Sequence, residues 1–216
     1  MRYIPIANGP QHASSIILGC MRMPALSVQD AAGMIRAAWE EGVNFFDHAT
    51  CYGDGEAEQR FGDAFPQTGL HREDVILQSK CGLHFDRREF DWSKEDILES
   101  VDGSLKRLHT DHLDVLLLHR PDLLFEPEQV AEAFETLEKN GKVRFFGVSN
   151  VTPGQLTLLE KFVRQPLVIN QLQFSLEQTQ LIDPGLYLNN LTTERSCDRD
   201  NGVLDYCRLH DITIQA

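Results

Sequence analysis

Short apolar runs alternate with longer amphipathic stretches along most of the chain. The runs have the length and composition of buried strands, and the stretches between them repeat apolar residues at helical spacing. The predicted strands are residues 16–19, 43–47, 75–80, 113–119, 143–149, 167–171 and 212–214. The predicted helices begin near Ser27, Glu56, Ser93, Pro127, Thr152 and Gly202.

Turn and cap residues mark the boundaries of these elements. A Ser27-Val28-Gln29-Asp30 capping box opens the first helix, and Asn140-Gly141 is typical of a helix end. The segment 3–15 is predicted to form a hairpin that turns at Asn8-Gly9-Pro10. The polar stretch 172–201 is expected to be irregular.

Strict alternation of strand and helix predicts parallel strands joined by right-handed crossovers, in the α/β class. The residues after the first strand, Gly19-Cys20-Met21-Arg22, lack the G-x-G-x-x-G of a dinucleotide-binding sheet. The pattern therefore favours a (β/α)₈ TIM barrel with an N-terminal hairpin cap. Such a barrel needs eight strands and roughly 250 residues. We expect residues 1–216 to form one barrel domain of about six to seven βα units that lacks its C-terminal part.

Composition narrows the class of protein. The net charge of −13 argues against nucleic acid or an anionic membrane as a partner. No apolar run reaches the roughly 20 residues of a membrane span, and the N-terminus has no secretory core, so a cytoplasmic location is expected. The five cysteines form no C-x-x-C pair, which suits a reducing compartment and predicts no metal site.

Polar residues gather where the predicted strands end. Asp47, Lys80 and His119 each close an apolar strand, and Tyr52 follows Asp47 by five residues. In such barrels the carboxyl ends of the strands carry the chemistry. Singly, Asp47 and Lys80 could form a buried ion pair and His119 could be a core histidine. Together, at equivalent strand ends, they indicate an acid–base site.

At these positions the chain resembles the aldo-keto reductase family, in its bacterial oxidoreductase branch. The matching segments follow the family's order and are F-F-D-H-A-T-C-Y-G (45–53), S-K (79–80), L-D-V-L-L-L-H-R-P-D (113–122), G-K-V-R-F-F-G-V-S-N (141–150) and N-Q (170–171). The resemblance implies a (β/α)₈ barrel and NADPH-dependent (NADP+) oxidation–reduction of small aldehydes or ketones. It says nothing of oligomeric state.

The resemblance also implies the roles of individual residues. Tyr52 would be the proton donor, with Asp47, Lys80 and His119 completing a catalytic tetrad. Because a free tyrosine is a weak acid, a nearby Lys80 cation is expected to lower the pKa of Tyr52. The expected cofactor-binding residues are Gly19, Met21, Arg22, Ser149, Asn150 and Gln171.

Two other functions stay open. One is a non-catalytic cofactor-binding or regulatory subunit with the same fold. The other is a lyase in which Lys80 forms a Schiff base.

The family's remaining cofactor contacts come from loops after the seventh and eighth strands, beyond this sequence. The loop 86–92, with Trp92, is expected to cover the pocket.

Overall fold

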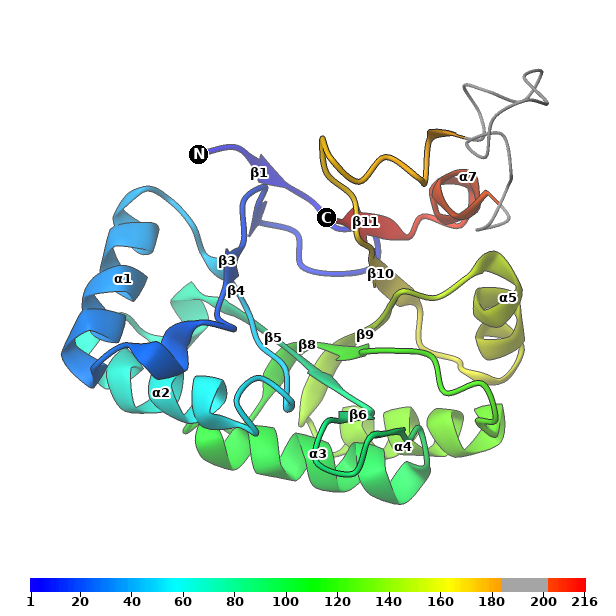
Figure 1. Cartoon of the computed structure of the whole chain (residues 1–216), viewed down its shortest axis with the longest axis horizontal. Helices are drawn as coiled ribbons and strands as arrows, with labels where there is room; N and C mark the ends of the chain where they lie inside the picture. Colours follow the sequence, from blue (N-terminus) through cyan, green and yellow to red (C-terminus); the bar gives the residue numbers. More distant parts are fainter. Residues whose placement is uncertain (184–201) are drawn as a thin grey trace.

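Seven parallel strands form the main sheet in the computed structural model, which describes residues 1–183 and 202–216. Their order across the sheet is β11-β10-β9-β8-β5-β4-β3. Figure 1 shows the sheet curling into a half-barrel with the helices on its outer side. The strands are β3 (Leu18–Gly19), β4 (Phe45–Asp47), β5 (Ile76–Cys81), β8 (Leu113–Leu118), β9 (Val143–Ser149), β10 (Leu167–Gln171) and β11 (Thr213–Gln215). The predicted α/β class and incomplete (β/α)₈ barrel are confirmed.

The helices begin where the sequence places their caps. Ser27 accepts a hydrogen bond from the Asp30 backbone N–H at 3.1 Å, and Thr152 forms a capping box with Gln155. Gly141 takes φ 69° directly after the fourth helix, as the Asn-Gly signal predicts. The helices are α1 (Val28–Glu40), α2 (Glu56–Ala64), α3 (Lys94–Arg107), α4 (Pro127–Lys139), α5 (Pro153–Phe162) and α7 (Val203–Leu209).

Side chains alternate between the inside and the outside of the half-barrel. In β8, Val115 and Leu117 belong to the inner apolar cluster, whereas Leu116 and Leu118 pack in the outer cluster under the helices. All four are at most 1% exposed, which explains why this strand reads as a continuous apolar run. The same two-residue period decides which polar residues face the interior.

The predicted N-terminal hairpin covers one end of the barrel. Strands β1 (Tyr3–Ile4) and β2 (Ala13–Ser14) pair antiparallel, and Ala13 is buried in the inner cluster. Asn44 fastens the hairpin to the sheet, because its Oδ1 accepts from the Ser14 N–H at 2.8 Å and its Nδ2 donates to the His12 carbonyl.

Some boundaries differ from the sequence-based expectation. The first strand was expected at 16–19, but only Leu18–Gly19 pairs, because β3 lies at the sheet edge and has β4 as its neighbour. The stretch 172–201, expected to be irregular, lies outside the described residues from position 184 onward. One of the five cysteines, Cys197, lies in that part.

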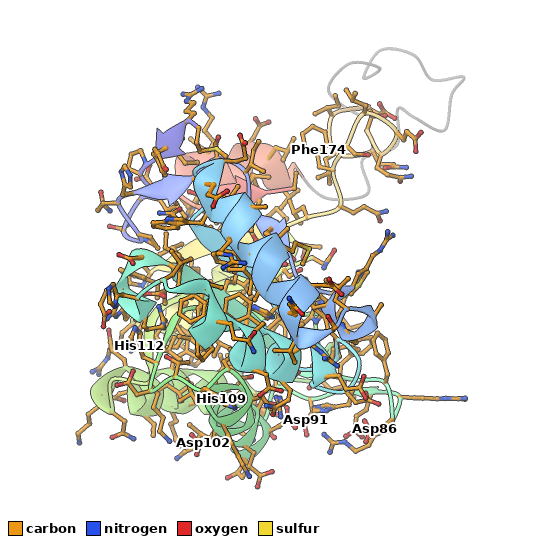
Figure 2. All side chains as sticks on the ribbon, turned by 90° about the vertical axis from the view of Figure 1, so that its left-hand side faces the viewer. Asp86, Asp91, Asp102, His109, His112 and Phe174 are labelled. Atoms are coloured by element: carbon orange, nitrogen blue, oxygen red, sulfur yellow. The ribbon has the colours of Figure 1, made fainter. Side chains whose placement is uncertain are left out.

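The two ends of the sheet are easy to tell apart. Figure 2 labels His112, just before β8, towards the left and Asp86, beyond β5, towards the right. Asp86 lies in the loop between the short strands β6 (Leu83–His84) and β7 (Glu89–Phe90), at the carboxyl end of the sheet. The residues predicted to carry the chemistry lie at this carboxyl end.

Candidate active site

Asp47, Lys80 and Tyr52 meet at the carboxyl end of β4 and β5. The Lys80 Nζ lies 2.7 Å from the Asp47 Oδ2 and donates to the Tyr52 hydroxyl oxygen at 3.0 Å. It also donates to the His48 carbonyl oxygen at 2.9 Å. Lys80 is fully buried, so these three acceptors satisfy the ammonium group without water.

A tight turn brings Tyr52 back over the strand end. Gly53, Asp54 and Gly55 have φ angles of 60°, 49° and 90°. A side chain at Gly55 would collide with Arg107, since a Cβ there would lie 2.6 Å from the Arg107 Nε. Gly55 therefore fits this turn because it permits positive φ and leaves room for Arg107.

His119 follows β8 and faces the same pocket as Tyr52. Its backbone N–H donates to the Cys81 carbonyl at 2.9 Å, and its ring meets the Tyr52 ring edge to face with centroids 5.9 Å apart. A pocket of about 760 Å³ opens over both residues. The proposed tetrad members are thus brought together, as the sequence predicts for their positions.

The ionisation of Lys80 and His119 follows from their burial and from the charged groups around them. Burial disfavours the Lys80 ammonium, but Asp47 and Tyr52 outweigh it, so the pKa of Lys80 lies above its ordinary value. Burial, together with the charges of Lys80 and Arg120, lowers the pKa of His119 to about 3. At neutral pH the lysine is charged and the imidazole is neutral.

The pKa of Tyr52 differs in direction from the expectation. Burial raises it above its ordinary value, and the charge of Lys80 offsets this only in part. The Lys80 charge does act in the predicted direction, but the desolvation of the phenol is larger. Tyr52 therefore carries its proton at neutral pH.

The six expected cofactor residues divide between two adjoining pockets. Ser149, Asn150 and Gln171 line the pocket that holds Tyr52 and His119. Gly19 and Arg22 line a neighbouring pocket of about 490 Å³. Met21 and Tyr52 line both, which makes them the boundary between the two spaces.

Several residues at the site were not predicted from the sequence. Gln78 donates to the Asp47 Oδ1 at 2.5 Å, and Gln215 accepts from Gln78 at 2.8 Å. Gln171 also donates to Gln215, so hydrogen bonds between three side-chain amides connect Gln171 to Asp47. The two-residue period of β5 could have placed Gln78 inside with Lys80. The remaining unpredicted pocket residues are Cys51, Gly53, Asp54, Leu83, Phe85, Phe90 and Arg120.

The loop expected to cover the pocket does so only in part. Phe85 and Phe90 of the β6–β7 hairpin line the pocket. Trp92, in contrast, is fully buried and packs against Phe125 with ring centroids 5.0 Å apart, so its side chain is not part of the cover. His48 is also fully buried and lies edge to face on Phe61 of α2, outside the barrel interior.

Among the residues described, no helix has the length and apolar character needed to cross a membrane. In that same part of the chain, no three His, Cys, Asp or Glu side chains gather as metal ligands would.

Solved structures similar to this chain include aldo-keto reductases. The holo form of the aldo-keto reductase AKR11C1 from Bacillus halodurans matches 99% of this chain and 65% of its own, with a TM-score of 0.77 and 26% identity. An aldo/keto reductase from Klebsiella pneumoniae in complex with NADP and acetate matches 95% of this chain and 64% of its own, with a TM-score of 0.72 and 26% identity.

The sequence matches agree with the structural ones. The uncharacterized oxidoreductase YcsN of Bacillus subtilis (strain 168) is 40% identical over an alignment of 185 residues that covers 81% of this chain and 61% of that protein. The chain thus spans about three fifths of the length of this relative. The sequence profile of the Aldo/keto reductase family matches residues 15–216. The chain belongs to the aldo/keto reductase family.

Proposed function

We propose that the protein carrying this chain reduces aldehyde or ketone carbonyls with NADPH, and that Tyr52 is the proton donor. The observation that carries the proposal is the buried Lys80 ammonium. It lies between the Asp47 carboxylate at 2.7 Å and the Tyr52 hydroxyl at 3.0 Å, and Tyr52 lines a pocket of about 760 Å³. Membership of the family supports the reaction class.

The tetrad can stabilise an oxygen that gains negative charge. A nicotinamide cofactor, when bound, supplies the hydride for carbonyl reduction. Tyr52 holds its proton at neutral pH, because burial raises its pKa. As charge develops on a substrate oxygen, Tyr52 donates this proton, and the Lys80 ammonium stabilises the tyrosinate that remains.

Asp47 and His119 have supporting roles in this proposal. Asp47 keeps Lys80 charged and fixes its Nζ at the tyrosine hydroxyl, with Gln78 holding the other carboxylate oxygen at 2.5 Å. His119 is neutral, since its pKa is lowered to about 3, and one ring N–H can donate to the substrate oxygen.

The side chains at the ends of β9 and β10 fit a nicotinamide carboxamide. Asn150 takes φ 61° and its Nδ2 donates to the Ser149 Oγ at 2.7 Å, which fixes the amide at the pocket wall. Within residues 1–183 and 202–216 the Asn150 Oδ1 has no hydrogen-bond donor, so it is free to accept one from a carboxamide. We assign Ser149, Asn150 and Gln171 to the nicotinamide, and Gly19, Met21 and Arg22 to the adjoining wall.

The choice of NADPH follows the similar structures. The aldo/keto reductase from Klebsiella pneumoniae was solved with NADP bound. The similarity covers 95% of the present chain, which supports the same cofactor here.

Lyase chemistry at Lys80 fits the geometry less well. A Schiff-base lysine must lose its proton to attack a carbonyl. Here the pKa of Lys80 is raised, because the Asp47 carboxylate and the Tyr52 hydroxyl outweigh the effect of burial. Lys80 is therefore a poor nucleophile and a good electrostatic partner for Tyr52.

The test is NADPH oxidation with a panel of neutral and charged aldehydes, in the wild type and in Tyr52→Phe. Removing the acid should lower kcat by about 10²-fold to 10⁴-fold. Tyr206→Phe is the matched control, because that hydroxyl bonds Thr157 and Glu160 outside the pocket. Equal turnover by wild type and Tyr52→Phe would show that the proton comes from elsewhere. Tight NADPH binding with no turnover on any aldehyde would favour a regulatory subunit instead.

A further inference from the structure

The thiol of Cys51 lies against the ring of His119 inside the pocket. The Cys51 Sγ is 3.4 Å from the His119 Nδ1, within hydrogen-bond range for sulfur. Cys51 is 6% exposed, and it lines the pocket together with Tyr52 and His119. The contact joins residues 68 positions apart, the loop after β4 and the end of β8.

Both partners are neutral at physiological pH. Burial raises the pKa of the Cys51 thiol to about 11, against a smaller opposing effect of the Lys80 charge. Burial also lowers the pKa of His119 to about 3. A neutral imidazole has one N–H and one lone pair, and the hydrogen bond at one nitrogen decides which nitrogen keeps the proton.

The chemistry of the contact favours one direction of donation. A thiol sulfur is a weak acceptor, whereas the unprotonated imidazole nitrogen is a good one. Donation from the Cys51 S–H to Nδ1 leaves the proton of the ring on Nε2. In the part of the chain that the structure describes, Nε2 has no hydrogen-bond partner, and it is not among the buried polar atoms left without one. It is therefore the nitrogen open to a ligand.

The ring is also held in place by its backbone. The His119 N–H donates to the Cys81 carbonyl at 2.9 Å, and the Asn150 Nδ2 approaches the His119 carbonyl at 3.4 Å. With the backbone fixed at the end of β8, the contact with Cys51 determines the protonation of the ring more than its location.

We propose that Cys51 is a positioning residue that donates to the His119 Nδ1 and holds the imidazole as its Nε2–H tautomer. The catalytic consequence rests on the function proposed above: the Nε2–H is then the donor that meets the substrate carbonyl oxygen. The opposite tautomer would turn a lone pair towards that oxygen and repel it.

The test combines a spectroscopic signature with kinetics. The tautomer is measured by ring ¹H–¹⁵N correlation spectra of the ¹⁵N-histidine-labelled protein at neutral pH, with the His119 signals identified by their loss in His119→Gln. The wild type and Cys51→Ser, which keeps a donor, should show Nε2–H. Cys51→Ala should show a mixture or the Nδ1–H form. Cys207→Ala, which removes a buried thiol of α7 away from the pocket, should leave the His119 pattern unchanged.

The kinetic arm uses the same variants. Losing one neutral hydrogen bond should lower kcat/KM for aldehyde reduction by about fivefold to tenfold in Cys51→Ala, and Cys51→Ser should restore it to within about twofold of wild type. An Nδ1–H pattern in the wild type, or a Cys51→Ala spectrum identical to the wild type, overturns the inference. A tautomer change without aldehyde turnover in any variant would uphold the role of Cys51 and refute the proposed function.

Discussion

Two buried carboxylates at opposite ends of the sheet are bound to cations in different ways. At the carboxyl end, Asp47 pairs with Lys80, whose Nζ also contacts the Tyr52 hydroxyl. At the amino end, the Asp114 Oδ2 accepts from Arg72 at 2.7 Å and from a backbone N–H at 2.9 Å, while its Oδ1 accepts from Arg144 at 2.8 Å. The exposed fractions of Asp47 and Asp114 are 8% and 5%.

The cations that bind the two carboxylates distinguish the candidate catalytic one, Asp47, from the structural one, Asp114. A guanidinium stays charged at all ordinary pH values, so neither arginine that donates to Asp114 can transfer a proton. Lysine and tyrosine both carry exchangeable protons, and Tyr52 opens onto a large pocket. Burial and ion pairing alone therefore do not identify a site. A transferable proton next to a cavity does.

The largest effect is expected when Lys80 becomes methionine. The change leaves the Asp47 carboxylate buried without its cation, which should lower the free energy of unfolding by about 3–5 kcal/mol. It also removes the charge that stabilises tyrosinate, so kcat should fall by about 10²-fold or more. Urea unfolding and NADPH oxidation measure the two effects.

Lys142→Met is the matched control for that change. Lys142 pairs with Asp102, but both side chains are at least one third exposed. Solvent screens such a pair, so its loss should cost at most about 1 kcal/mol. Equal losses from the buried and exposed lysines would contradict the importance given to burial.

Asp114→Asn should separate stability from activity. The amide cannot accept all the hydrogen bonds from Arg72, Arg144 and the Leu77 N–H, so unfolding should become easier by about 2 kcal/mol. The site lies at the other end of the sheet, so kcat/KM should remain within about twofold of wild type. A drop in kcat/KM comparable to that of Lys80→Met would remove the distinction between the two ends.

His48, which follows Asp47 in the sequence, offers a pH-dependent test. Burial, with a further contribution from Lys80, lowers the pKa of His48 to about 3, while an unfolded histidine titrates at about 6.5. Between these values the unfolded chain binds more protons, so stability is lost as the pH falls below about 6.5. His48→Leu should remove up to about 1.4 kcal/mol per pH unit from that slope. Stability curves that stay parallel from pH 7 to pH 4 would contradict it.

Local signals predicted the fold well. The caps at Ser27 and Thr152 and the strand bounds 143–149 and 167–171 agree with the structure, because they depend on residues close in the sequence. The grouping of Asp47, Lys80 and His119 was also predictable, since equivalent strand ends meet in a barrel.

What could not be predicted depends on tertiary contacts. The contact of Cys51 with His119 spans 68 residues, and the hydrogen bond from the Gln78 side chain to the Gln215 side chain spans 137. The direction of the Tyr52 pKa shift depends on how deeply the phenol is buried, and composition does not reveal that depth. The loop of Trp92 was expected over the pocket, but the indole itself fills the core beside Phe125.

The most direct measurement is kcat/KM for aldehyde reduction in Asp47→Asn and Asp114→Asn, assayed together. Each change removes one buried negative charge and keeps the shape of the side chain. We predict that Asp47→Asn loses at least about 10²-fold, because Lys80 is no longer held charged at Tyr52, and that Asp114→Asn stays within about twofold. Equal losses in both variants, or full activity in Asp47→Asn, would contradict the claim that the carboxyl end of the sheet is the catalytic one.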